Sequence, residues 1–191
     1  MVVYSLFFIL LIIGAIFNST SQAKTFLGLI MLVLYLIIGL RDLSVGPDTP
    51  SYVEDFERFA RMNYDQMLSA AFAKSEPLYV IISWLASLIS DNYIVFLLIW
   101  ALFPCVALYG LFKRELVTTA DYLNGLIVFF VIGLYAFFVA GIRQTAALSI
   151  ILLAFPYFKQ IKFDTILHFY NDTNWIKFLL CMCVAYLIHN S

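Results

Sequence analysis

Seven apolar stretches, each close in length to a membrane-spanning helix, follow one another along this chain of 191 residues. A bilayer core takes about 20 apolar residues per helix, and a shorter stretch reaches across by borrowing flanking residues. The stretches cover residues 2–17, 26–40, 77–90, 93–112, 122–141, 143–158 and 176–190. The sequence therefore predicts an all-α fold, a polytopic transmembrane helix bundle of six to seven spans that forms a single transmembrane domain over residues 1–191.

The composition excludes the common classes of soluble protein. Apolar residues make up 64% of the chain and charged residues 12%, whereas a soluble domain has about 45–50% and about 25%. The net charge of −1 argues against a nucleic-acid partner. The three cysteines lie inside apolar runs, where packing is their expected role. No cluster of residues has the spacing of a metal site, so we expect no metal and no other cofactor.

Residues 41–76 form the polar part of the chain, a loop between the second and third apolar stretches. This loop holds 11 of the 23 charged residues. Its turn at Gly46-Pro47-Asp48 precedes Thr49, which we expect to cap a helix whose first residue is Pro50. Apolar side chains then recur at helical spacing as far as Met67, which predicts one amphipathic helix lying on the bilayer surface.

The start of this loop gathers residue types that bind phosphate groups. Arg41, Asp42, Asp48 and Tyr52 crowd the predicted helix N-terminus beside the membrane. Backbone N–H groups at a helix start, together with a guanidinium, suit a phosphate or diphosphate. The alternative is that Arg41 and Asp42 anchor the membrane edge and that Asp48 and Thr49 are only helix caps.

Three further positions carry polar side chains at the ends of apolar stretches. Glu76 precedes Pro77, where it either complements a helix dipole or acts as a general base. Arg143-Gln144 lies between two apolar runs, so Arg143 either reaches toward the interface or faces a cavity. His189 is either a structural group or a proton-transfer residue, because a histidine pKa lies near neutrality.

The distribution of Lys and Arg gives one indication of orientation. Nine of the eleven basic residues fall on the N-terminal side of the membrane, and only Lys24 and Arg143 fall on the opposite side. The positive-inside rule would then place the N-terminus and the 41–76 loop in the cytoplasm.

Four short motifs, in order along the chain, resemble those of the EpsG family. They are Gly39 to Tyr52 (read as G-x-R-D-x-x-x-G-x-D-T-x-x-Y), Glu76-Pro77-Leu78-Tyr79, Arg143-Gln144, and His189 with Ser191. That family comprises multi-pass bacterial membrane proteins of exopolysaccharide and capsule gene clusters. Its members are longer than this chain, so we expect an N-terminal fragment, which would be inactive if the later spans complete the site.

The resemblance implies a Wzy-like polymerase at the outer face of the bacterial cytoplasmic membrane. Such a protein joins oligosaccharide repeat units carried on undecaprenyl diphosphate: an acceptor hydroxyl attacks the anomeric carbon of the donor, and the lipid diphosphate leaves. Arg41 and Arg143 would hold the diphosphate, with Asp42, Tyr52 and Gln144 beside them as substrate-binding residues. Asp48, Glu76 and His189 are the candidate catalytic residues. An outer-face site contradicts the charge count, and we keep the family interpretation because functional arginines bias such a count.

Two other functions stay open. A transporter or flippase for lipid-linked saccharides would show repeated halves, broken helices and charges within spans; here the charges lie at span ends, and we see no repeat. A noncatalytic membrane scaffold of the synthesis complex is the third hypothesis. The expected partners are the undecaprenyl-diphosphate-linked oligosaccharide, the lipid bilayer and other polysaccharide-synthesis membrane proteins.

Overall fold

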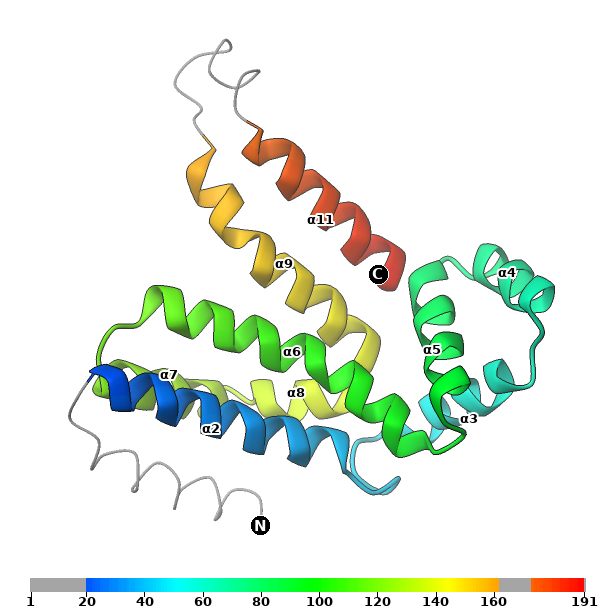
Figure 1. Cartoon of the computed structure of the whole chain (residues 1–191), viewed down its shortest axis with the longest axis horizontal. Coiled ribbons are helices and arrows are strands. Elements are labelled where there is room, and N and C mark those ends of the chain that lie inside the picture. The colour runs from blue at the N-terminus through cyan, green and yellow to red at the C-terminus, as the bar shows by residue number, and fades with distance from the viewer. Residues whose placement is uncertain (1–19, 162–172, 191) are drawn as a thin grey trace.

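The computed structural model describes residues 20–161 and 173–190, and the regular secondary structure in this part of the chain is all helix, as the apolar stretches predict. Figure 1 shows its nine helices in chain order. They are α2 (Thr20–Gly39), α3 (Thr49–Ala60), α4 (Tyr64–Ala73), α5 (Pro77–Ile89), α6 (Tyr93–Glu115), α7 (Thr119–Val131), α8 (Leu134–Ala140), α9 (Ile142–Gln160) and α11 (Asn174–Ile188).

Apart from α3 and α4, the helices overlap the predicted apolar stretches, but few of them meet a strict length test for a membrane span. Among the described residues, α6 is the only single helix that is long and apolar enough to cross a membrane. Helices α7 and α8 reach that length only together. Helices α2, α5 and α11 are apolar but have shorter apolar segments, and the stretch 2–17 lies outside the described residues. The number of spans therefore stays a prediction.

The stretch 122–141, expected as one span, is broken. Helices α7 and α8 meet at an angle of 60°. The break falls at Gly133, whose φ of +79° is a left-handed conformation that residues with a Cβ rarely adopt. The backbone conformation of this one glycine causes the bend. The apolar run on either side gives no indication of it, so the sequence predicted a single span.

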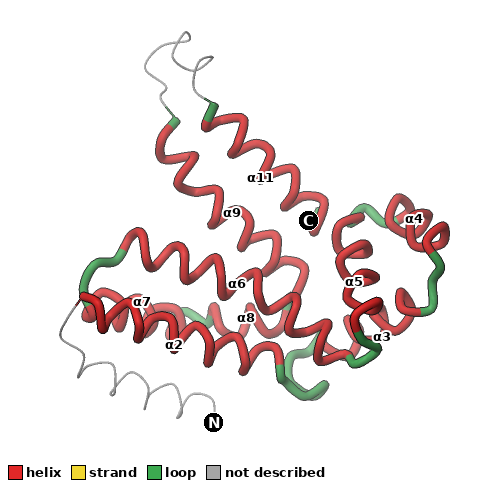
Figure 2. Tube along the Cα trace, in the orientation of Figure 1, coloured by secondary structure: helices red, strands yellow, loops and turns green. Residues whose placement is uncertain are grey.

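Two apolar cores hold the helices together. In Figure 1, α2 lies along α6, and α9 runs antiparallel to α11. One core joins α2, α6, α7 and α8. The other joins α3, α4 and α5 to one end of α6 and to α9 and α11. In the second core, the helices of the polar loop and the last described helix pack against α5. Figure 2 shows the connections between these elements as loops.

The 41–76 loop contains two helices instead of one. Asn63 begins α4, because its side chain accepts the backbone N–H of Gln66 while the Gln66 side chain accepts the backbone N–H of Asn63. The apolar side chains of α3 pack inside the protein, with Phe56 and Phe59 fully buried. The predicted cap at Thr49 is wrong: Asp48 occupies the N-cap position without a side-chain hydrogen bond, and Thr49 is the first residue of α3.

Candidate functional site

Glu76 is the centre of a polar cluster that joins three helices. It directly precedes α5, and its residue is only 6% exposed. One carboxylate oxygen accepts a hydrogen bond from Nη1 of Arg143, at the start of α9. The other contacts Nδ1 of His189, directly after α11. Residues far apart in sequence therefore meet at one buried carboxylate.

Aromatic rings hold the guanidinium of Arg143 from the other sides. Its Cζ lies 5.5 Å from the centre of the Tyr52 ring and 5.3 Å from that of Tyr79. Rings at such distances attract a cation through their electron-rich faces. Tyr79 is fully buried and packs against Trp100, at 5.4 Å between ring centres. Because burial raises the pKa of the Tyr52 phenol, that side chain stays neutral at physiological pH.

The contact between Glu76 and His189 sets the chemistry available to the imidazole. A carboxylate at Nδ1 favours the tautomer with a proton on that nitrogen, which leaves Nε2 as the basic nitrogen. The same carboxylate stabilises the imidazolium once Nε2 has taken a proton. The pair has the arrangement of a general base with its orienting group, with a cation on the same carboxylate.

A groove of about 510 Å³ begins beside this cluster and runs between α8, α9 and α11. His189 and Gln144 lie at one end of it. The rest of the lining comes from side chains that are apolar apart from one tyrosine hydroxyl: Phe137, Ala147, Leu148, Ile151, Met182, Ala185 and Tyr186. A cavity that is polar at one end and apolar along its length is shaped for an amphiphile. We call it the α9–α11 groove.

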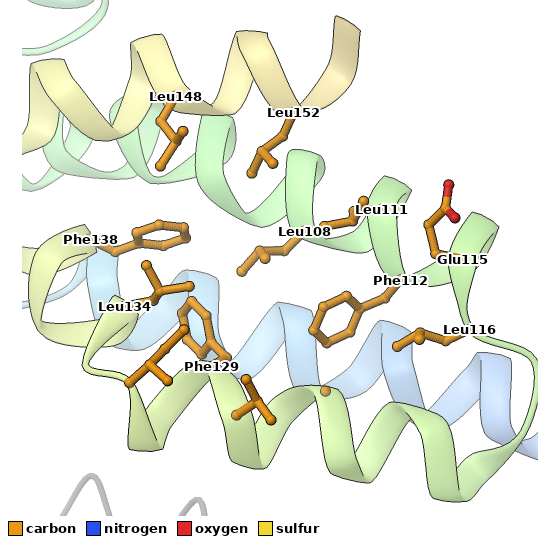
Figure 3. Close-up of a pocket in the computed structure, with 13 residues that line it drawn as sticks. Leu108, Leu111, Phe112, Glu115, Leu116, Phe129, Leu134, Phe138, Leu148 and Leu152 are labelled. Carbon is orange, nitrogen blue, oxygen red and sulfur yellow. The ribbon is translucent and has the colours of Figure 1, made fainter. Parts of the chain in front are cut away.

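A second groove, of about 360 Å³, lies on another face of α9 and is apolar almost throughout. Figure 3 shows leucine and phenylalanine side chains of α6, α7, α8 and α9 pointing into it, with Glu115 at one edge. That carboxylate pairs with Lys159 at 2.9 Å. Leu148 lines both grooves, and neither Glu76 nor the two residues bound to it line the second one.

The comparison with known families identifies the chain. The model of the EpsG family matches residues 24–191. The chain belongs to the EpsG family. The matched range contains all four motifs and every residue of the Glu76 cluster. No curated protein and no solved structure matches it.

Membership of the EpsG family makes this chain a membrane protein of exopolysaccharide synthesis. The apolar helix α6 agrees with that assignment, because it is long enough to cross a bilayer.

Arg41, in the first motif of this EpsG chain, lies apart from the Glu76 cluster. It is 5% exposed, its Nε donates to Thr49 Oγ1 at 3.1 Å, and its Nη1 donates to the carbonyl of Ile38 at 2.9 Å. Burial lowers the pKa of Arg41 to about 10, so the guanidinium stays charged at neutral pH. Among the described residues, no hydrogen bond or ion pair joins Arg41 to Glu76, Arg143 or His189.

The two aspartates of the first motif are also outside the cluster. Asp42 is exposed and accepts hydrogen bonds from the N–H and hydroxyl of Ser44, which hold the pKa of Asp42 below its usual value. Asp48 is exposed at the start of α3. Of the sequence-predicted residues, the structure thus brings together Glu76, His189, Arg143 and Tyr52. It places Gln144 in the adjoining groove. Among the described residues, Arg41, Asp42 and Asp48 form no hydrogen bond or ion pair with these four, although Arg41 and Asp48 lie near enough to Tyr52 to interact with it electrostatically.

Tyr79 belongs to one of the four motifs but is not among the candidate site residues predicted from the sequence. It lies three residues after Glu76, so the two side chains share a face of the helix start. That spacing within Glu76-Pro77-Leu78-Tyr79 was the available signal. In the part of the chain that the structure describes, no group of three or more His, Cys, Asp and Glu residues could hold a metal ion.

Proposed function

We propose that this EpsG-family chain polymerises lipid-linked oligosaccharide repeat units in a bacterial cytoplasmic membrane, as a multi-pass protein. The reaction is glycosyl transfer from an undecaprenyl-diphosphate donor. One observation carries the proposal: the Glu76 carboxylate binds a histidine and an arginine beside the polar end of a groove with an apolar lining. A glycosyl transfer with a diphosphate leaving group needs one base and one cation, and the cluster supplies both.

The proposed step uses the residues of the cluster as follows. Nε2 of His189 takes the proton of an acceptor sugar hydroxyl while Glu76 stabilises the imidazolium. The hydroxyl oxygen forms a bond to the anomeric carbon of the donor, and the bond from that carbon to the diphosphate oxygen breaks. The diphosphate leaves with the electron pair and keeps its prenyl chain. Arg143 compensates its charge, and the proton on His189 passes to solvent.

Within this proposal, the α9–α11 groove holds the first part of the prenyl chain. His189 belongs to both the polar cluster and the lining of this groove, and Gln144 lines the groove beside it. The groove of Figure 3 lacks such a polar end apart from Glu115, whose charge Lys159 compensates. The α9–α11 groove therefore matches the substrate better.

Proteoliposomes that contain the full chain and labelled lipid-linked repeats test the reaction. We expect longer saccharide chains from the wild type and at least a 100-fold lower rate from His189→Gln, the usual scale of a lost general base. His168→Gln changes the other histidine of the sequence and is the matched control. A polymer yield from His189→Gln equal to that of the control would refute the role of the base.

A flippase for the same lipids is the second candidate, and the bend between α7 and α8 favours it. Broken helices are common in transporters, where half-helix ends line the transport site. The same vesicles distinguish the two functions, because a flippase moves labelled repeats across the bilayer without lengthening them. If the wild type neither lengthens nor translocates the repeats, both proposals fail for this chain.

A further inference from the structure

A small cavity lies where the end of α2 meets α6, α8 and the start of α9. Arg41, Trp100 and Thr145 contribute its polar groups, and the remaining lining is apolar. About 10 Å³ is open to the centre of an occupant, which is room for one water molecule or one monatomic ion. A phosphate or a sugar does not fit. The cavity is separate from the α9–α11 groove and shares no lining residue with it.

Two residues that line this cavity each carry a buried hydrogen-bond donor with no acceptor in the described part of the chain. The donors are Nη2 of Arg41 and Nε1 of Trp100. The two residues are 5% and 2% exposed, so bulk water does not serve them. The hydroxyl of Thr145 donates to the carbonyl of Phe137 at 3.3 Å. Buried N–H groups are nearly always paired, so two on residues that line one cavity indicate a bound acceptor.

The charge of Arg41 specifies the acceptor further. No carboxylate among the described residues forms an ion pair with this guanidinium, which binds only a hydroxyl and a backbone carbonyl. Burial also lowers the pKa of Arg41, because it disfavours the charged form of the guanidinium. A water molecule would accept from both N–H groups but would leave the charge uncompensated. A small anion satisfies the donors and the charge together.

We propose that this cavity binds a monatomic anion of the chloride class, held between Nη2 of Arg41 and Nε1 of Trp100. The ion links the loop after α2 to the middle of α6, so it fixes the first EpsG motif against the bundle. It has a structural role, and it does not depend on the glycosyl-transfer proposal. The guanidinium of Arg143, by contrast, already has a carboxylate partner in Glu76.

Thermal unfolding of the detergent-solubilised full chain tests the site. Chloride is compared with gluconate, an anion too large for the cavity, at constant ionic strength so that general screening is equal. We expect a Tm that rises with chloride and saturates, because a ligand of the folded state stabilises it by mass action. Trp100→Phe should abolish the chloride dependence. Trp84→Phe is the matched control and should keep it, because the Trp84 indole donates to the carbonyl of Met62 at 3.0 Å instead.

Bromide locates the site directly, without a variant. Crystals of the wild type grown in bromide should show an anomalous peak within hydrogen-bond distance of the Arg41 guanidinium and the Trp100 indole. A Tm that is the same in chloride and gluconate, with no bromide peak, would mean that water fills the cavity and would overturn the proposal. A chloride effect that persists in Trp100→Phe, with the peak elsewhere, would overturn it as well.

Discussion

The carboxylate of Glu76 contacts both Arg143 and His189. Its side chain is 8% exposed, against 30% for Arg143 and 12% for His189. The carboxylate is therefore the most buried of these three side chains, and it contacts both of the others. Breaking a buried ionic contact costs free energy because it leaves the partner uncompensated.

Glu76→Gln tests this dependence with almost no change in shape. We expect the free energy of unfolding to fall by about 1–3 kcal/mol, because the amide keeps one acceptor but loses the charge that Arg143 faces. Polymer formation should fall too, since the imidazolium of His189 loses its stabilising carboxylate. Denaturant unfolding in detergent measures the first effect, and the proteoliposome assay measures the second.

Glu57→Gln is the matched control for that substitution. Glu57 is exposed and lies 3.9 Å from Arg61, which is exposed as well. A surface pair of this kind contributes about 0–1 kcal/mol, so the control should lie close to the wild type. Equal stability for the two variants would show that the carboxylate of Glu76 does not hold the cluster together.

At the scale of elements, the apolar stretches predicted where most helices lie but not where they break. The stretches 77–90 and 93–112 correspond to α5 and α6 because Pro77 and Asn92 start helices by local chemistry that the sequence displays. The bend at Gly133 and the start of α4 at Asn63 were missed. Glycine permits a positive φ without requiring one, so Gly133 alone does not predict a bend. Asn63 can also occur within a helix, so its presence alone does not predict the start of α4.

Gly46, in the loop after α2, gives the sharpest test of an element junction. Its φ is +91°, and a Cβ at this position would lie 2.8 Å from the carbonyl oxygen of Val139 in α8. We expect Gly46→Ala to lower the free energy of unfolding by about 1–3 kcal/mol through backbone strain and this clash. Denaturant unfolding gives the value.

We expect Gly28→Ala to change the free energy of unfolding in the opposite direction to Gly46→Ala. Gly28 lies within α2, and a Cβ added there would meet no atom of a neighbouring helix or side chain within 4 Å. Alanine there should raise the stability by about 0.5–1 kcal/mol, because alanine has the higher helix propensity. If Gly46→Ala raises the stability as Gly28→Ala does, the tight junction between the loop and α8 is absent in solution.

At the scale of the whole molecule, the sequence identified most residues of the cluster as candidates but did not predict which of them contact one another. Arg41 and Arg143 carry the same charge beside apolar stretches, and nothing in either local sequence says which one meets Glu76. The packing of α11 against α9 and α5 decides it, because that packing brings His189 and Arg143 to the start of α5. Contacts between helices distant in sequence leave no trace in local spacing.

The two grooves make a prediction about the hydrocarbon part of the substrate. Ala147→Phe narrows the α9–α11 groove, and Val128→Phe places the same ring at the groove of Figure 3. With long prenyl carriers, we expect the first variant to raise KM about tenfold, which is about 1.4 kcal/mol of lost binding. With carriers cut to two or three isoprene units the effect should be much smaller. If Val128→Phe raises KM more than Ala147→Phe does, the prenyl chain of the substrate binds in the groove of Figure 3 instead.

The count of basic residues and the family resemblance predict opposite orientations in the membrane. A measurement of which side the 41–76 loop faces decides between them. Cysteine is introduced at exposed Glu57 in a chain whose three native cysteines are serine. If the 41–76 loop faces outward, as the polymerase proposal requires, a membrane-impermeant maleimide labels this position in intact cells. The control is Asp91→Cys, at the other end of α5, which should react only after permeabilisation. The reverse pattern would support the positive-inside count.

The position of the Glu76 carboxylate has a consequence for biosynthesis. Its two partners follow it by 67 and 113 residues, so they leave the ribosome long after it does. Until α11 has been translated and inserted, Glu76 and Arg143 can pair, but the imidazole is missing. Under the proposed mechanism, a half-made chain in the translocon therefore lacks its base, and glycosyl transfer would begin only after the last of the three helices has docked.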